Sequence, residues 1–219
     1  MRKTTLMITA ILIAATSYAG GAKYQKAMGE ALAGFSEVES VADYQELGNK
    51  FMMIAQAEKS EWLPYYYHAQ CYILMSFAEN EKPEKKDEYL NVAEQSIAKM
   101  LDLTPGESEV YVMQGLLYTA RLVIDPMNRG QKYGSLSAQA IGTALGIEPE
   151  NPRARYMQIA NEMGTASFFG SDISASCQKA RVLYDEWDSY TLKSRIHPRW
   201  GKDQLADTMK KCGGAKLNK

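Results

Sequence analysis

The residues that could do chemistry are few and lie far apart. The chain of 219 residues contains two histidines, His68 and His197, and neither has a cysteine or carboxylate cluster near it in the sequence. Searches for a zinc-protease motif, a nucleophile elbow, a phosphate-binding loop and a calcium-loop spacing find none. Pairs of carboxylates occur, as at Glu37/Glu39 and Glu107/Glu109, but they lie at charged ends of expected helices, where solvation explains them. We therefore expect a protein that is not an enzyme, with no catalytic residues, no metal site and no cofactor.

Three cysteines suggest one disulfide. Cys177 lies near the start of one expected helix and Cys212 at the end of the last, so antiparallel packing of these helices would bring them together. A bridge that closes a loop of about 36 residues would stabilise the fold by roughly 3–4 kcal/mol in the chain-entropy model. Two free thiols are the alternative. Cys71 lies within a helix and is expected to be a small buried residue.

The segment from Glu107 to Pro149 indicates which elements would position these residues, because its spacing predicts a pair of packed helices. Tyr111, Gly115 and Tyr118 share one helix face, because they are spaced by four and then three residues. A second helix carries Ile141 and Ala144 on its facing stripe and ends before Pro149. Glycine in a helix interior is destabilising by about 0.5–1 kcal/mol, so Gly115 indicates close approach of the partner helix.

The same spacing recurs upstream, with Tyr65, Ala69 and Tyr72 on a first helix and Ala93, Ile97 and Pro105 on a second. This pattern resembles the tetratricopeptide repeat (TPR) family from about Tyr65 to Trp187. The resemblance implies an all-α, TPR-like α-α superhelix of about nine helices. Each unit is about ten residues longer than the standard 34. We expect the excess to form inserts between paired helices, at 79–86 and 125–134.

The N-terminus predicts export. Arg2 and Lys3 precede an apolar run at Leu6–Ala15, which is too short to span a bilayer, and Ser17-Tyr18-Ala19 suits a signal peptidase. Residues 1–19 are therefore expected to be a signal peptide, with no membrane anchor and a periplasmic or secreted product. Residues 20–213 would form a single helical-repeat domain and 214–219 a flexible tail. Removing residues 1–19 lowers the net charge from −1 to about −3, which argues against nucleic-acid binding.

TPR proteins usually hold a peptide or a partner helix on the concave face built by the first helix of each pair. Carried over to this chain, the resemblance implies an apolar groove with tyrosines, lined by Tyr66, Gln70, Ile73, Val112, Leu116, Thr119, Tyr156, Ala160 and Met163. The third unit departs from the pattern, since Arg155 and Glu162 replace its aromatics. The expected function is an exported scaffold for an unidentified protein or peptide.

The alternative is a periplasmic small-molecule binder, in which the groove narrows to an enclosed tyrosine-lined pocket. The insert that contains Asp125, Asn128 and Arg129 could cap such a pocket or contact a partner. It could also be a simple turn. We favour the turn, because turn chemistry explains every residue except Arg129.

Overall fold

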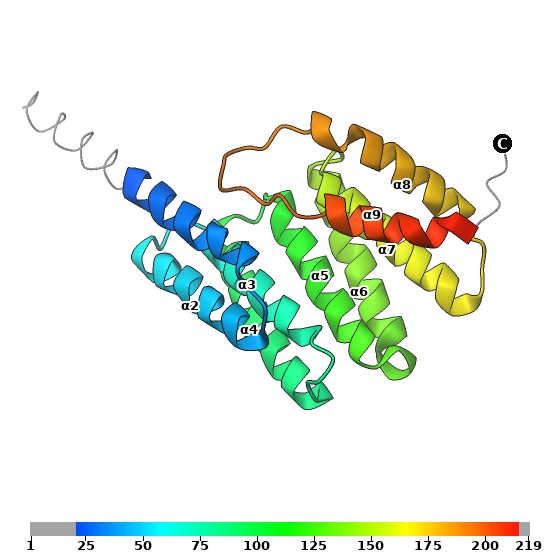
Figure 1. Cartoon of the computed structure of the whole chain (residues 1–219), viewed down its shortest axis with the longest axis horizontal. Coiled ribbons are helices and arrows are strands. Elements are labelled where there is room, and N and C mark those ends of the chain that lie inside the picture. The colour runs from blue at the N-terminus through cyan, green and yellow to red at the C-terminus, as the bar shows by residue number, and fades with distance from the viewer. Residues whose placement is uncertain (1–20, 215–219) are drawn as a thin grey trace, which may run out of the picture.

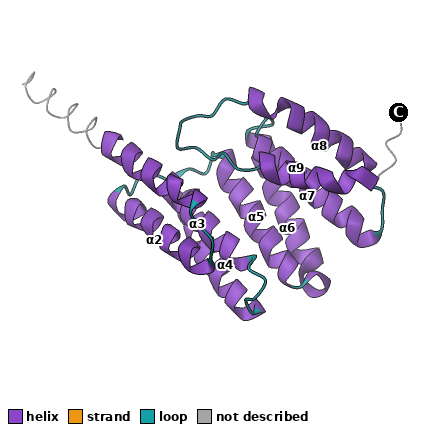
Figure 2. Cartoon of the chain, viewed as in Figure 1, coloured by secondary structure: helices purple, strands orange, loops and turns teal. Residues whose placement is uncertain are grey.

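The computed structural model describes residues 21–214, and this part of the chain is all-α (Figures 1 and 2). The expected signal peptide lies outside the described residues, as does the expected tail apart from Gly214. A helix at 21–33 is followed by η1 (Gly34–Ser36), α2 (Val41–Ala57), α3 (Leu63–Ser76), α4 (Pro83–Leu103), α5 (Ser108–Ile124), α6 (Pro126–Ile147), α7 (Pro152–Phe169), α8 (Ser174–Glu186), η2 (Trp187–Ser189), α9 (Lys202–Lys210) and η3 (Lys211–Gly214).

Local sequence sets the helix ends. Ser40 caps α2, because its side chain accepts a hydrogen bond from the Asp43 backbone N–H, and Asn151 caps α7 by accepting from Arg153 and Ala154. A proline occupies the first turn of α3, α4, α6 and α7, where its missing N–H costs no hydrogen bond. Gly170 ends α7 in the left-handed conformation (φ 67°).

Paired helices pack closely where the sequence places small residues. A Cβ on Gly115 would lie 2.6 Å from Ile141 Cδ1, so only glycine lets α5 and α6 approach this far. Polar side chains join the same two helices. Ser137 Oγ donates to the Gly115 carbonyl at 3.0 Å, and Ser108 Oγ donates to the Ala144 carbonyl at 2.9 Å. The glycine and its facing stripe thus form the helix contact that their spacing predicted.

The extra length of each unit is not in long inserts, and that expectation was wrong. The helix α6 begins at Pro126, directly after α5, so most of 125–134 is helical. In the upstream unit α4 begins at Pro83, which leaves only a short connection after α3. The reason is that an Asp-Pro or Lys-Pro pair serves a helix start as well as a turn. The additional residues therefore lengthen α4 and α6.

Three apolar clusters form the interior. The largest joins the N-terminal helix with α2, α3, α4 and α5, a second lies between α5, α6 and α7, and a third joins α7, α8 and α9. In the third cluster a disulfide links Cys177 at the start of α8 to Cys212 in η3, with 5.8 Å between the Cα atoms. It fastens the last helix to the array.

A long connection crosses the array between η2 and α9. We call residues 190–200 the strap (Figures 1 and 2). Ile196 in the strap is 2 % exposed and joins the largest apolar cluster, and its carbonyl accepts a 2.8 Å hydrogen bond from the Tyr67 hydroxyl on α3. Arg195 reaches the N-terminal helix, where its Nε donates to Gln25 Oε1 at 3.3 Å. The strap thus connects the C-terminal cap to the first helices.

Candidate functional site

The strap covers the helix face on which a groove was expected. On α3, Tyr66 and Ile73 are fully buried and Gln70 is 8 % exposed. The Tyr66 hydroxyl accepts a 2.8 Å hydrogen bond from Trp200 Nε1 and donates to Glu109 Oε2 at 3.2 Å. Burial, and next the Glu109 carboxylate, raise the pKa of Tyr66 well above its ordinary value. These three residues therefore do not line an open groove.

The groove positions on α5 and α7 are also largely internal. Val112 is fully buried and Leu116 partly buried, and Thr119 donates to the Gly115 carbonyl at 3.0 Å. On α7, Tyr156 packs edge-on against Trp200 of the strap, with the ring centroids 6.4 Å apart. Met163 is 3 % exposed in the third apolar cluster, and Ala160 is half-buried. The expected open groove is absent here because chain segments of the protein itself fill it.

The residues of the expected insert have structural partners. Asp125 caps α6 by accepting a hydrogen bond from the Asn128 backbone N–H at 3.2 Å, and Asn128 Nδ2 donates to Asp125 Oδ2 at 2.7 Å. Arg129, which turn chemistry did not explain, makes a two-pronged contact with Asp87 on α4 at 2.7 and 2.8 Å. None of the three lines the cavity described next.

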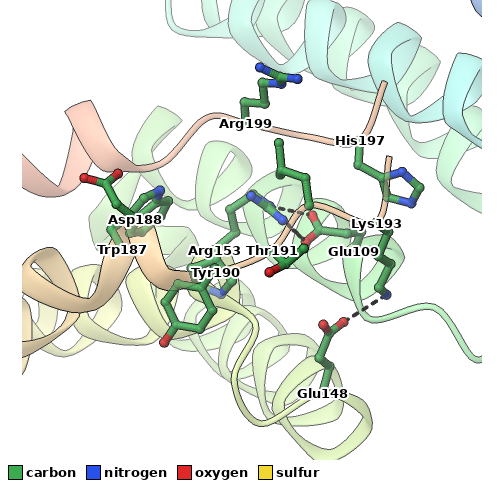
Figure 3. A pocket seen from close by; sticks show the side chains of 12 residues that line it. Glu109, Glu148, Arg153, Trp187, Asp188, Tyr190, Thr191, Lys193, His197 and Arg199 are labelled. Atoms are coloured by element: carbon green, nitrogen blue, oxygen red, sulfur yellow. Dashed lines mark hydrogen bonds and ion pairs between the residues drawn. The ribbon is translucent and has the colours of Figure 1, made fainter. Parts of the chain in front are cut away.

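A cavity of about 250 Å³ lies where the strap passes over the starts of α5 and α7 (Figure 3). The strap supplies half of its lining, and η2 adds an aromatic ring. The residues that line it are Glu109, Glu148, Pro152, Arg153, Trp187, Asp188, Tyr190, Thr191, Leu192, Lys193, His197 and Arg199. Its wall thus combines aromatic and aliphatic side chains with several cations.

A buried ion pair forms one wall of this cavity. Glu109 on α5 is 2 % exposed and Arg153 on α7 is 7 % exposed, and Arg153 Nη2 lies 2.7 Å from Glu109 Oε1. Asn151 Nδ2 donates to the same oxygen at 2.7 Å, and Tyr66 donates to Oε2. Because every carboxylate oxygen is hydrogen-bonded, this pair is fixed in place and joins three helices.

The strap brings two further cations to the cavity, and they differ in their partners. Lys193 Nζ contacts Glu107 at 2.9 Å and Glu148 at 3.0 Å. Burial alone would lower the pKa of Lys193, but its bonds to the two carboxylates outweigh burial and raise the pKa. Arg199 is exposed and donates only to the Arg195 carbonyl, at 3.4 Å. Within residues 21–214, Arg199 is the cavity cation without a carboxylate partner.

His197 contributes an imidazole to the lining of this cavity. Its Nδ1 lies 2.7 Å from Ser194 Oγ, and its ring packs edge-on against Trp62 with centroids 5.8 Å apart. Burial lowers the pKa of His197, although the Glu107 carboxylate opposes this shift. The other histidine, His68, is buried against Ser96 at 2.7 Å and does not reach the cavity.

Sequence reasoning missed the strap as a functional element. It treated His197 as a loop residue and gave no role to Lys193, Tyr190 or Arg199. The available signal was the placement of Ile196 and Trp200 four residues apart in a stretch that is rich in polar and cationic residues. The two apolar side chains are expected to pack against the helices, but their spacing does not indicate which helix they contact.

Two other findings bear on the class of protein. None of the helices within residues 21–214 has the length and apolar character of a membrane span. The described side chains also include no group of three or more His, Cys, Asp and Glu residues placed to hold a metal ion. The fold and cavity define a class: an all-α array of helix pairs with a small cavity under a C-terminal strap.

Comparison with solved structures gives a specific relative of this architecture. The chain is similar to the HusA haemophore from Porphyromonas gingivalis, with a TM-score of 0.77 and 27 % sequence identity. The match covers 90 % of this chain and 96 % of that one. It supports the all-helical fold over nearly the whole length.

The comparisons at the level of sequence find no match. No family model matches the chain, and no curated protein matches it. The TPR resemblance therefore stands only as a likeness of helix pairing, and family membership is not supported.

The expected protein or peptide partner was wrong. The solved structure that the chain matches is called a haemophore, a name for a carrier of a small molecule. The strap gives the physical reason, since it packs on Tyr66 and Tyr156, where a bound peptide was expected.

Proposed function

We propose that this protein is an exported haem-binding carrier without enzymatic activity, and that the cavity under the strap is where it holds haem. The similarity to the HusA haemophore over 90 % of the chain is the observation that carries this proposal. This proposal corresponds to the alternative hypothesis from the sequence, a small-molecule binder. The strap, and not the segment 125–134, would cover its pocket.

The lining of the cavity suits haem chemically. Haem is a flat apolar ring that bears two carboxylates at one edge. Trp187, Tyr190 and Leu192 offer aromatic and aliphatic surface, while Arg199 offers a cation without a carboxylate partner in the described chain. Guanidinium groups bind carboxylates through two parallel hydrogen bonds, which suits this role.

The size of the cavity limits how haem is held. At about 250 Å³ it is below the 300–1,000 Å³ typical of pockets for drug-sized ligands. We therefore expect the ring to be only partly enclosed, with part of it outside the cavity. A carrier that must pass its ligand on gains from such partial enclosure.

Two features favour export. The first 19 residues have the pattern of a signal peptide, and the Cys177–Cys212 disulfide suits an oxidising compartment. Both agree with a carrier that acts outside the cytoplasm.

A haem titration tests the function. Residues 20–219 are titrated with ferric haem, and binding is followed by the Soret band and by tryptophan fluorescence. The three tryptophans are useful reporters, since Trp187 lines the cavity, Trp62 contacts His197 and Trp200 belongs to the strap. Saturable one-to-one binding with quenching is expected, and a titration without saturable binding would rule the function out.

A charge reversal tests the location. Arg199→Glu is expected to weaken haem binding about tenfold, because it places a carboxylate beside the carboxylates of the ligand. Arg181→Glu is the matched control, since Arg181 is exposed on α8 and does not line the cavity. Equal affinities in the two variants would show that haem binds elsewhere.

A further inference from the structure

The cavity under the strap is smaller than the ligand that the proposed function assigns to it, and the inference that follows rests on that function. At about 250 Å³ the cavity does not fit a whole porphyrin, since pockets for drug-sized ligands measure roughly 300–1,000 Å³. A larger ligand needs part of the lining to move. The strap is the segment to examine, because it supplies half of the lining.

The second half of the strap is firmly anchored. Within residues 196–200, the side chains of Ile196 and Pro198 are buried against the helices. Trp200 Nε1 donates a 2.8 Å hydrogen bond to the Tyr66 hydroxyl on α3. Moving this half would expose apolar surface to water, which is unfavourable. Residues 196–200 are therefore a fixed wall of the cavity.

The first half of the strap is held differently. Residues 191–195, which we call the flap, include no buried side chain, and Leu192 is 38 % exposed. In the described chain, residues 191–193 take part in no hydrogen bond between backbone groups. Segments with few buried apolar contacts and few backbone hydrogen bonds open at low free-energy cost. The flap is thus the part of the strap that can move.

A cluster of ion pairs holds the flap against the helices. Lys193 Nζ lies 2.9 Å from Glu107 at the start of α5 and 3.0 Å from Glu148 at the end of α6 (Figure 3). The side chains of Lys193 and Glu148 are 47 % and 40 % exposed. Ion pairs this exposed contribute little to stability and are weakened by salt. The cluster therefore orients the flap and is easily broken.

The two ends of the flap are fixed points. Tyr190 precedes it, and the Tyr190 hydroxyl is hydrogen-bonded by the Arg155 guanidinium on α7. Ile196 follows it and is 2 % exposed in the largest apolar cluster. The remaining contact of the flap with a helix is polar, since Arg195 Nε donates to Gln25 Oε1 at 3.3 Å. A segment fixed at both ends and held by polar contacts between them is built to hinge.

We propose that the flap is a hinged cover, closed by the ion pairs of Lys193, which opens the cavity to its ligand while residues 196–200 stay in place. Opening withdraws Thr191, Leu192 and Lys193 from the lining and enlarges the space over the starts of α5 and α7. A carrier can then take up a ligand larger than the closed cavity.

Distances between two spin labels test the flap without any ligand. The flap pair is Ser135→Cys on α6 with Thr191→Cys. The control pair is Ser135→Cys with Arg199→Cys, which joins α6 to the anchored half of the strap. All three positions are exposed, and the free thiol of Cys71 is buried away from the label.

The flap pair is expected to show a longer and broader distance distribution when Lys193→Glu turns attraction to Glu107 and Glu148 into repulsion. Adding Glu148→Lys restores an ion pair of reversed polarity and should bring back the shorter distance. The control pair should keep its distribution in every variant. A flap distance that Lys193→Glu leaves unchanged, or a control distance that changes equally, overturns the proposal.

A covalent lock tests whether the flap admits the ligand. Lys193→Cys with Glu148→Cys is joined by a bismaleimide linker, and the same protein with both thiols capped by N-ethylmaleimide is the control. Linking is expected to slow the association of ferric haem, followed by tryptophan quenching, at least about tenfold relative to the capped protein.

The outcomes separate this proposal from the function itself. Slower association in the linked protein supports the flap as the entrance. Equal rates in linked and capped protein overturn that role and leave haem binding intact. Failure of the wild type to bind haem overturns the proposed function, while the spin-label distances still decide whether the flap opens.

Discussion

Several buried polar residues link the described helices through matched partners. Glu109 and Arg153 neutralise each other between α5 and α7, and Arg121 on α5 contacts Glu94 at 2.7 Å and Asp87 at 3.3 Å on α4. Removing one member of such a pair leaves a buried charge, which is strongly destabilising. His68 differs, because it is buried without a charged partner and is hydrogen-bonded only to Ser96.

His68 should make the protein less stable in mild acid. Burial lowers its pKa to about 4, from an ordinary 6.5. Between these values the unfolded chain binds a proton that the folded protein does not, so the free energy of unfolding falls as pH drops from 6.5 to 4. Above pH 6.5 both states are neutral and this effect is absent.

The expected result is a loss of about 2 kcal/mol in wild-type protein between pH 7.5 and 4.5 that His68→Gln does not show. Urea unfolding of both proteins at the two pH values measures it. Parallel losses in wild type and variant would mean that other groups cause the acid sensitivity.

At the scale of the element, the sequence predicted the helix pairs well and their ends poorly. The helix periodicity and the close packing of paired helices depend on neighbours in the same unit, and the sequence shows them at Tyr65, Gly115, Ile141 and Ala144. Asp125-Pro126 could begin a turn or a helix, and local chemistry is the same for both. Helix α6 therefore took residues that were expected to form an insert.

Close packing of α5 on α6 gives a prediction for two glycines. Gly115→Ala is expected to destabilise the protein by about 1–2 kcal/mol, because the added methyl meets Ile141 at 2.6 Å in a buried contact. Gly142→Ala on α6 is the control, since a Cβ there meets nothing within 4 Å. It should stabilise by about 0.5–1 kcal/mol through helix propensity. Chemical denaturation of both variants measures the difference; a neutral Gly115→Ala would show that Ile141 can move aside.

The start of α9 depends on Gly201, which joins it to the strap. Gly201 has φ 118°, and a Cβ there would lie 2.5 Å from the Trp187 ring. Gly201→Ala is therefore expected to displace the strap and to weaken haem binding about tenfold or more while the helix content stays nearly constant. Haem titration together with circular dichroism measures this; unchanged affinity would mean that the strap position does not control the site.

At the scale of the whole molecule, the sequence could predict the array but not the strap. Hydrophobic periodicity is a local signal, whereas the contacts of the strap span 129 residues to Tyr67 and 134 to Tyr66. The candidate groove residues lie on helix faces that the protein itself largely covers. The cavity could not be predicted, because the strap that forms it has no periodic pattern.

The disulfide should matter most for the C-terminal third of the chain. Cys177→Ser with Cys212→Ser is expected to lower the free energy of unfolding by roughly 3–4 kcal/mol in the chain-entropy model. The same double variant should increase amide hydrogen exchange in α8 and α9 more than in α3 and α4, because the bridge joins α8 to η3, which directly follows α9. Cys71→Ser is the comparison for loss of a thiol, and uniform exchange across the chain would contradict a local role.

The long reach of the strap also affects how the protein is made. The helix pairs can stack one after another as the chain emerges, since each contacts its neighbours in sequence. Ile196 and Trp200 cannot reach Tyr67 and Tyr66 until nearly all 219 residues have been delivered. Contacts of such sequence separation form late, so the side of α3 that the strap covers stays open in a partly delivered chain. A growing chain would thus need shielding from aggregation until residues 196–200 arrive.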